Sequence, residues 1–154
     1  MKPIYSIMLI LFSLLIAGNV QAQRIEKNVP IIVSEAFQQK FPDKDPVWFS
    51  NHQGPYGTRL VYEARFMFDN RYSKAFYENE GKLIAFATII EQSELPKRVR
   101  DYMEKTYPTL SITEALLATH INKDIHYEVG VYIDNEFVTM TFSQEGQYLE
   151  TVSR

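Results

Sequence analysis

Hydrophobic positions along this chain follow helical spacing twice, and each time the spacing then changes to that of a strand. Apolar residues recur every three or four positions from Ile32 to Phe41 and again from Val99 to Tyr107, which predicts two amphipathic helices. Proline is tolerated in a first helical turn and cannot continue a helix. Prolines stand at both ends of each segment: Pro30, Pro42, Pro96 and Pro108.

Alternation with a period of two follows each helix and predicts antiparallel strands. The dipeptides Asp69-Asn70 and Asp134-Asn135 are typical of two-residue hairpin turns, because both residue types tolerate positive φ. Gly81 and Gly146 are expected to supply the left-handed residue of the next hairpin. Counting outward from the two turns gives these cross-strand partners: Phe66 with Ser73, Arg65 with Lys74, Met67 with Tyr72, Val131 with Val138, Gly130 with Thr139, and Tyr132 with Phe137.

The two helix-to-strand segments also match each other in sequence. Val29-Pro30 recurs as Leu95-Pro96, 66 residues later, and Tyr62-Glu63 recurs as Tyr127-Glu128, 65 residues later. Matches in the same order at turn and core positions indicate a tandem duplication. The sequence therefore predicts an α+β fold of two tandem repeats, about 29–90 and 95–152. Each repeat would be a helix followed by about four antiparallel strands, with the helices on one face of the sheet.

The first residues are predicted to be removed before folding. Lys2 precedes an apolar run from Ile7 to Ala17, and Val20-Gln21-Ala22 offers the small residues that a signal peptidase reads. Residues 1–22 are thus a predicted signal peptide, and residues 23–154 a single domain. The run is too short to span a bilayer, so no membrane anchor is expected after cleavage, and the location is predicted to be periplasmic or secreted.

The charge and the cysteine content of the mature chain narrow its class. Loss of Lys2 leaves 15 basic against 19 acidic residues, a net charge of −4, which argues against nucleic acid as a partner. The chain has no cysteine, so an exported domain of this kind depends on its apolar core alone. Tyrosine and phenylalanine, ten of each, make such a core feasible.

At this point the pattern resembles the exported PepSY-like proteins, also described as β-lactamase-inhibitor-like. The residues that carry the resemblance are the Val29-Pro30 and Leu95-Pro96 helix starts, the Phe41-Pro42 and Tyr107-Pro108 helix ends, and the Glu80-Gly81 and Glu145-Gly146 turns. The resemblance covers nearly all of the mature chain. It implies a duplicated helix-plus-sheet unit with a binding or inhibitory role outside the cytoplasm, and it identifies no target.

No catalytic pattern appears in the sequence. The serines show no nucleophile-elbow motif, no glycine-rich phosphate loop is present, and His52, His120 and His126 have no zinc-protease spacing. His120, Asp124, His126 and Glu128 form a loose cluster around a predicted turn and could ligate a metal ion, but such residues at an exposed turn are more often simply solvated. No catalytic residue, metal ligand or cofactor is therefore assigned.

The sheet face turned away from the helices offers the main candidate site. It would carry an apolar pair beside each Asp-Asn turn, and such exposed clusters rimmed with charge are typical of interfaces; the alternative is that cross-strand aromatic pairs only stabilise the hairpins. Arg65 opposite Lys74 places like charges together, which Glu63 or an acidic partner would have to balance. The predicted partner-binding residues are Met67, Tyr72, Arg65, Lys74, Tyr132 and Phe137.

The leading functional hypothesis is a non-enzymatic exported binding module. It would engage another extracytoplasmic protein through this open sheet face, with inhibition of that protein as one outcome. The same face could instead form a homo-oligomer. Two alternatives remain open from the sequence: a periplasmic sensor that holds a small molecule or metal ion between the halves, and an enzyme of unrecognised type.

Overall fold

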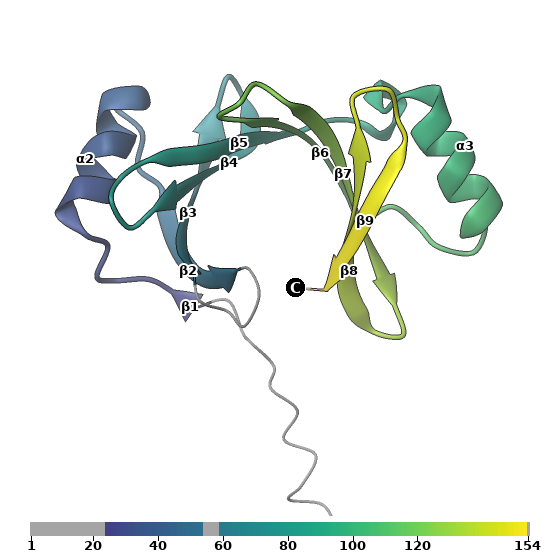
Figure 1. The fold of residues 1–154 in the computed structure, drawn as a ribbon, viewed down its shortest axis with the longest axis horizontal. Coiled ribbons are helices and arrows are strands. Elements are labelled where there is room, and N and C mark those ends of the chain that lie inside the picture. Colours follow the sequence, from purple (N-terminus) through teal and green to yellow (C-terminus); the bar gives the residue numbers. More distant parts are fainter. Residues whose placement is uncertain (1–23, 54–58, 154) are drawn as a thin grey trace, which may run out of the picture.

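The strands of this protein join into one continuous antiparallel sheet that curls like half of a barrel (Figure 1). The computed structural model describes residues 24–53 and 59–153. In this part of the chain the strands lie in the sheet in sequence order: β1 (Arg24–Ile25), β2 (Val47–Gln53), β3 (Arg59–Phe68), β4 (Arg71–Glu78), β5 (Leu83–Ile89), β6 (Glu114–His120), β7 (Ile125–Ile133), β8 (Glu136–Ser143) and β9 (Tyr148–Ser153).

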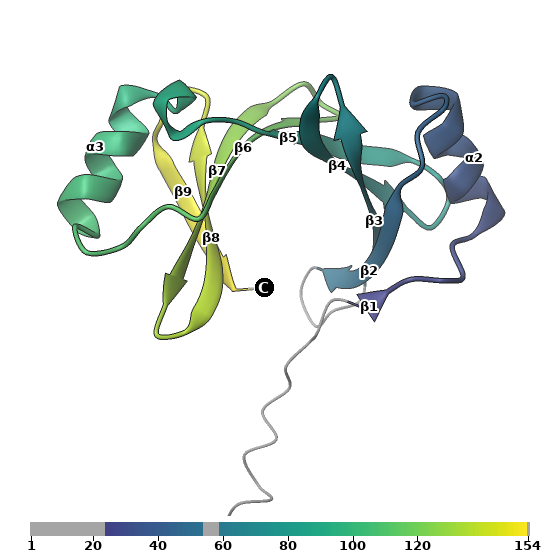
Figure 2. The same cartoon turned by 180° about the vertical axis from the view of Figure 1, so that it is seen from behind.

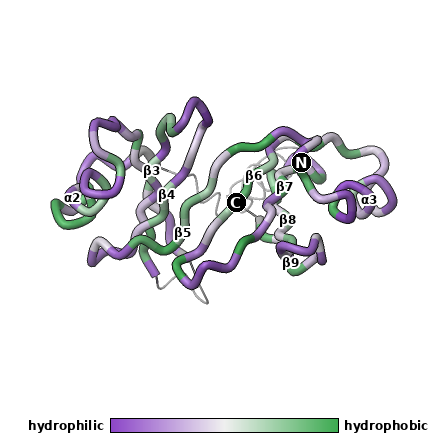
Figure 3. The backbone as a smooth tube through the Cα atoms, turned by 90° about the horizontal axis from the view of Figure 1, so that it is seen from above, coloured by the Kyte–Doolittle hydropathy of each residue, from purple (hydrophilic) through white to green (hydrophobic). Residues whose placement is uncertain are grey.

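Two helices of ten residues each lie on the outer, convex side of the sheet, at opposite ends of the arch (Figures 1 and 2). They are α2 (Ile31–Lys40) and α3 (Lys97–Thr106), and the short 3-10 helix η2 (Gln92–Glu94) precedes α3. Seen from above, α3 is largely hydrophilic along its exposed length (Figure 3). Among the described residues, no helix combines the length and the apolar character needed to cross a membrane.

The predicted fold class, α+β with two helix-plus-sheet repeats, is wrong. The molecule is mostly β over the described residues, with two short helices. Because β5 pairs directly with β6, the strands of both halves form a single sheet and not two separate units. Ala87 lies opposite Ala118 in this central pair. Both alanines are fully buried, and their small side chains leave room on the inner side for the sheet to curl. The predicted signal peptide lies outside the described residues.

Each helix covers its own apolar cluster on the convex side. Under α2, the ring of Phe37 packs edge-on against Phe66, with ring centroids 4.8 Å apart, and against Trp48 at 5.5 Å. Under α3, Val99 and Met103 belong to a cluster that includes apolar residues of β6, β7 and β8. The two clusters draw on different strands, β2 to β5 under α2 and β6 to β8 under α3, and the pairing of β5 with β6 joins these strands in one sheet.

The predicted hairpin registers are confirmed. Phe66 lies opposite Ser73 and Met67 opposite Tyr72, while Tyr132 lies opposite Phe137 in the second hairpin. Both residues of each Asp-Asn turn have positive φ, from 48° to 67°, as the turn type requires. Gly81 and Gly146 also have the predicted positive φ, at 81° and 76°.

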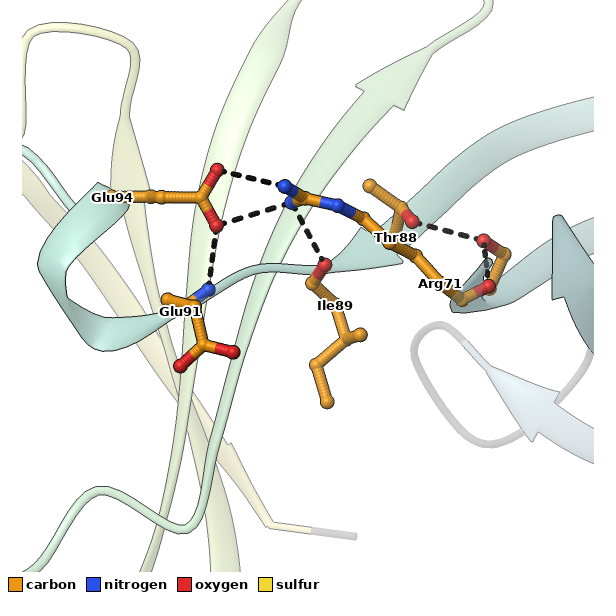
Figure 4. A network of polar contacts seen from close by, with 6 residues as sticks. Arg71, Thr88, Ile89, Glu91 and Glu94 are labelled. Atoms are coloured by element: carbon orange, nitrogen blue, oxygen red, sulfur yellow. Dashed lines mark hydrogen bonds and ion pairs between the residues drawn. The ribbon is translucent and has the colours of Figure 1, made fainter. Parts of the chain in front are cut away.

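The connection between the halves is held by an ion pair and its hydrogen bonds (Figure 4). Arg71, at the start of β4, donates two hydrogen bonds of 3.1 Å to the carboxylate of Glu94 in η2 and one to the carbonyl oxygen of Ile89. The same carboxylate accepts a 2.8 Å hydrogen bond from the N–H of Glu91. The segment that leads into α3 is therefore tied back onto the first half.

Candidate functional site on the concave sheet face

The concave face consists of the alternate strand positions that point away from the helices. Because side chains alternate across a strand and opposed residues share a face, the register defines its rows. Two rows run across the strands: Phe49, Glu63, Phe76, Ala85 and His120; and Val47, Arg65, Lys74, Ala87, Ala118 and His126.

Two ion pairs occupy the middle of this face. The Nε atom of Arg65 lies 2.7 Å from a carboxylate oxygen of Glu63, and the Nζ atom of Lys74 lies 2.7 Å from a carboxylate oxygen of Glu114. The Lys74 and Glu63 side chains are each only 5% exposed. Buried charges are tolerated only when paired. The primary role of these four side chains is therefore to stabilise the fold.

The like charges of Arg65 and Lys74 do lie opposite each other, as predicted, but the protein balances both of them. Glu63 neutralises Arg65 from the same strand, and Glu114 reaches Lys74 from β6, in the other half of the molecule. The opposed charges therefore give no separate indication of an acidic partner. Glu114 was not singled out in the sequence, because nothing in the local pattern shows that β6 lies two strands away from β4.

Aromatic rings surround this charged centre. The Arg65 guanidinium carbon lies 3.8 Å from the centroid of the Phe49 ring, a cation–π arrangement. Burial opposes the charge on Arg65, but the hydrogen bond and charge of Glu63 raise its pKa above the ordinary value. Burial also raises the pKa of Tyr72, although the charge of Arg65 works against the rise. Arg65 therefore keeps its charge at neutral pH.

An apolar rim follows the edge of the concave face where the Asp-Asn turns lie. Its members sit at the ends of their strands on that edge: Val47, Met67, Tyr72, Ile89, Tyr132, Phe137 and Val152. Met67 is 55% exposed and Tyr132 is 54% exposed, which is high for large apolar side chains.

The six predicted partner-binding residues thus separate into two groups. Met67, Tyr72, Tyr132 and Phe137 lie in the apolar rim, whereas Arg65 and Lys74 lie in the ion-paired centre. The Phe137 ring also has a structural contact, because a Cβ atom at Gly130 would lie 2.5 Å from its Cζ atom. The ring therefore covers a glycine on the neighbouring strand, a cross-strand contact that adds to hairpin stability.

The histidines lie elsewhere on the molecule than the apolar rim. The rings of His120 and His126 are 4.8 Å apart between centroids on the concave face, while His52 is exposed on β2. Burial, reinforced by His126, lowers the pKa of His120, against the opposite effect of Glu128 and Asp124. Within the described ranges, no three His, Asp or Glu side chains are arranged to hold a metal ion.

A cleft of about 460 Å³ lies at the junction of the halves. It is lined by β4 and β5 on one side and by η2 and the start of β6 on the other, including Arg71, Tyr72, Glu94 and Glu114. The cleft therefore borders both the Arg71–Glu94 ion pair (Figure 4) and the edge of the apolar rim, at Tyr72.

Comparison with known proteins supports the fold and does not give a function. No protein-family model matches the chain, and the search of curated proteins gave no match. The solved structures that match over most of both chains at low sequence identity include three from Bacteroides species. One is a DUF2874 family protein from Bacteroides uniformis, with 16% identity and a TM-score of 0.63, covering 80% of this chain and 88% of that chain.

The second is a protein from Bacteroides eggerthii described as "putative periplasmic", with 13% identity and a TM-score of 0.65, covering 82% of this chain and 89% of that one. The third is a BLIP-like protein from Bacteroides fragilis, with 17% identity and a TM-score of 0.57, covering 83% and 88%. The β-lactamase-inhibitor-like part of the predicted resemblance is thus confirmed as a likeness of fold. The PepSY-like part stays a prediction. The predicted location agrees with the description of the second protein.

Proposed function

We propose that this protein is a non-enzymatic binding module that works outside the cytoplasm and engages another exported protein through its concave sheet face. The proposal keeps the periplasmic or secreted location predicted from the signal sequence. It also keeps the PepSY-like relationship, which rests on the repeated dipeptides at the helix ends and turns. Inhibition of the partner is one consequence that such binding would have.

The observation that carries this proposal is the apolar rim. Large apolar side chains from both hairpins come to the same edge of one curved face, and two of them, Met67 and Tyr132, are more than half exposed. Tyrosine and methionine are enriched in interface cores, and large apolar side chains left exposed on one face favour an interaction surface.

Arg65 and Lys74 have a supporting role in the proposal. Their charges are balanced within the protein by Glu63 and Glu114, so the centre of the face adds no large net charge. Apolar contacts at the rim would then supply most of the affinity, while the partly exposed Arg65 would set the orientation of the partner.

The proposal can be tested by capture experiments on matched variants. The mature protein is immobilised and exposed to a periplasmic extract of its host, alongside Tyr132→Ser and Met67→Ser. The matched control is Ile31→Ser, because Ile31 is an even more exposed apolar residue, at 74%, on the convex side. We expect the parent and the control to retain the same partner and the two rim variants to lose it, with unchanged melting temperatures. Retention by the rim variants, or loss only in the control, would refute the proposal.

One observation favours a second candidate function, a small-molecule sensor. The junction cleft has the volume of ligand pockets, which are commonly about 300–1,000 Å³, and its lining is charged. A ligand there would contact both halves through Arg71 and Glu114. A screen for compounds that raise the melting temperature tests this, with Arg71→Ala as the variant that should lose the response.

A further inference from the structure

A pair of histidines on the concave face has a geometry that the proposed protein-binding function does not use. His120 lies at the end of β6 and His126 lies near the start of β7, the next strand in the sheet. The backbone holds them together, because the N–H of His120 donates a 2.9 Å hydrogen bond to the carbonyl oxygen of Asp124 in the intervening turn. Both side chains are half-buried and reach the surface.

The spacing of the rings matches that of two ligands on one metal ion. On a zinc ion with Zn–N bonds of about 2.0–2.1 Å and tetrahedral angles, two imidazole ring centres lie roughly 5 Å apart. The observed separation of the centroids is 4.8 Å. The neighbours opposite the pair in the register are Ala85, Ala118 and Ser143, all of which have small side chains.

The surrounding charge also favours a cation. The carboxylates of Asp124 and Glu128 lie close enough to act electrostatically on His120. The Asp124 carboxylate is engaged by the side-chain amide of Asn122 within the turn. With no third ligand arranged among the described residues, the two rings would share the ion with water.

We propose that His120 and His126 form a two-histidine site for a divalent transition-metal ion. Imidazole is a ligand suited to zinc, copper and nickel, and neutral rings on adjacent strands can both coordinate one ion. With water in the remaining positions, the site would be open and exchangeable, unlike the closed four-ligand sites that stabilise small folds.

The chain contains its own control for this proposal, because His52 is the only other histidine. The mature protein, purified without a polyhistidine tag, is titrated with zinc chloride by calorimetry, alongside His120→Ala, His126→Ala and His52→Ala. We expect the parent and His52→Ala to bind one equivalent with micromolar affinity. Each of the other two should bind at least ~10-fold more weakly, since a single protein ligand remains.

A second measurement counts the ligands directly. With copper(II) added, electron paramagnetic resonance should show coupling to two nitrogen nuclei in the parent and to one in either His120→Gln or His126→Gln, which keep a polar side chain if the alanine variants fold poorly. Unchanged affinity in the His120 and His126 variants, an equal loss in His52→Ala, or no binding by the parent would overturn the proposal. None of these results bears on capture by the apolar rim, so the two proposals stand or fall separately.

Discussion

Replacement of Glu114 by glutamine removes one charge from an ion pair that joins the two halves of the protein. Glu114 lies on β6 and its partner Lys74 lies on β4, with β5 between them. The Lys74 side chain is 5% exposed and the Glu114 side chain is 20% exposed. The variant therefore leaves a buried ammonium group beside a neutral amide.

The expected loss of stability follows from this burial. Removing one partner of a buried ion pair costs about 3–5 kcal/mol. Since Glu114 is partly exposed, water can replace some of its interaction, and we expect a loss of about 2–3 kcal/mol. Lys74→Met should cost less than Glu114→Gln, because the carboxylate that it leaves unpaired can reach water. The double variant should lose less stability than the two single losses added together.

Urea unfolding measures these differences, followed by circular dichroism and by the fluorescence of Trp48, the only tryptophan. With a slope of about 1–3 kcal/mol per molar urea, the midpoint for Glu114→Gln should fall by roughly 1–2 M. Asp101→Asn is the matched control, because Lys97 and Asp101 form a 2.6 Å pair with both side chains more than half exposed. Such a pair contributes about 0.5 kcal/mol or less. If Glu114→Gln changes stability as little as this control does, the pair does not hold the halves together.

Three further predictions concern single side chains. The Tyr77 hydroxyl is buried with no hydrogen-bond partner among the described residues, so Tyr77→Phe should raise the free energy of unfolding by about 1 kcal/mol. Burial raises the pKa of Tyr77 to about 12, so the parent should lose stability as the pH rises from 10 towards 12, and the variant should lose less over that range. Gly81→Val should lower the melting temperature more than Gly146→Val. Both positions have positive φ, but a Cβ atom at Gly81 would lie 2.7 Å from the carbonyl oxygen of Ile32, whereas one at Gly146 would lie 3.1 Å from Cβ of Arg98; equal effects would show that crowding against α2 is unimportant. The lowered pKa of His120 means that the unfolded chain takes up a proton first as the pH falls below about 6.5. Stability should therefore decline below this pH, and thermal melts of His120→Gln should show a shallower decline.

Local features of the fold could be predicted because each depends on residues that are close in sequence. Asp69-Asn70 and Asp134-Asn135 adopt the positive φ values of two-residue turns, and a turn of known length sets the register of both its strands. The separation of Phe66 from Met67 onto opposite faces follows from that register alone. For the same reason, the apolar pairs Met67–Tyr72 and Tyr132–Phe137 beside the turns could be placed on one face from the sequence.

Contacts between distant segments were decided only by the tertiary structure. The pairing of β5 with β6 merged the expected repeats into one curled, mostly β sheet, because open strand edges with matching alanines bury each other once both halves fold. Glu114, 40 residues away in the chain, pairs with Lys74 across that junction. The charge of Lys74, which lies opposite Arg65, is therefore neutralised by a residue of the protein itself. The sequence determined the turns and the strand faces, since these follow from local backbone preference and periodicity. The curvature, the buried ion pairs and the closeness of His120 to His126 depend on which strands lie side by side, and only the complete sheet determines that.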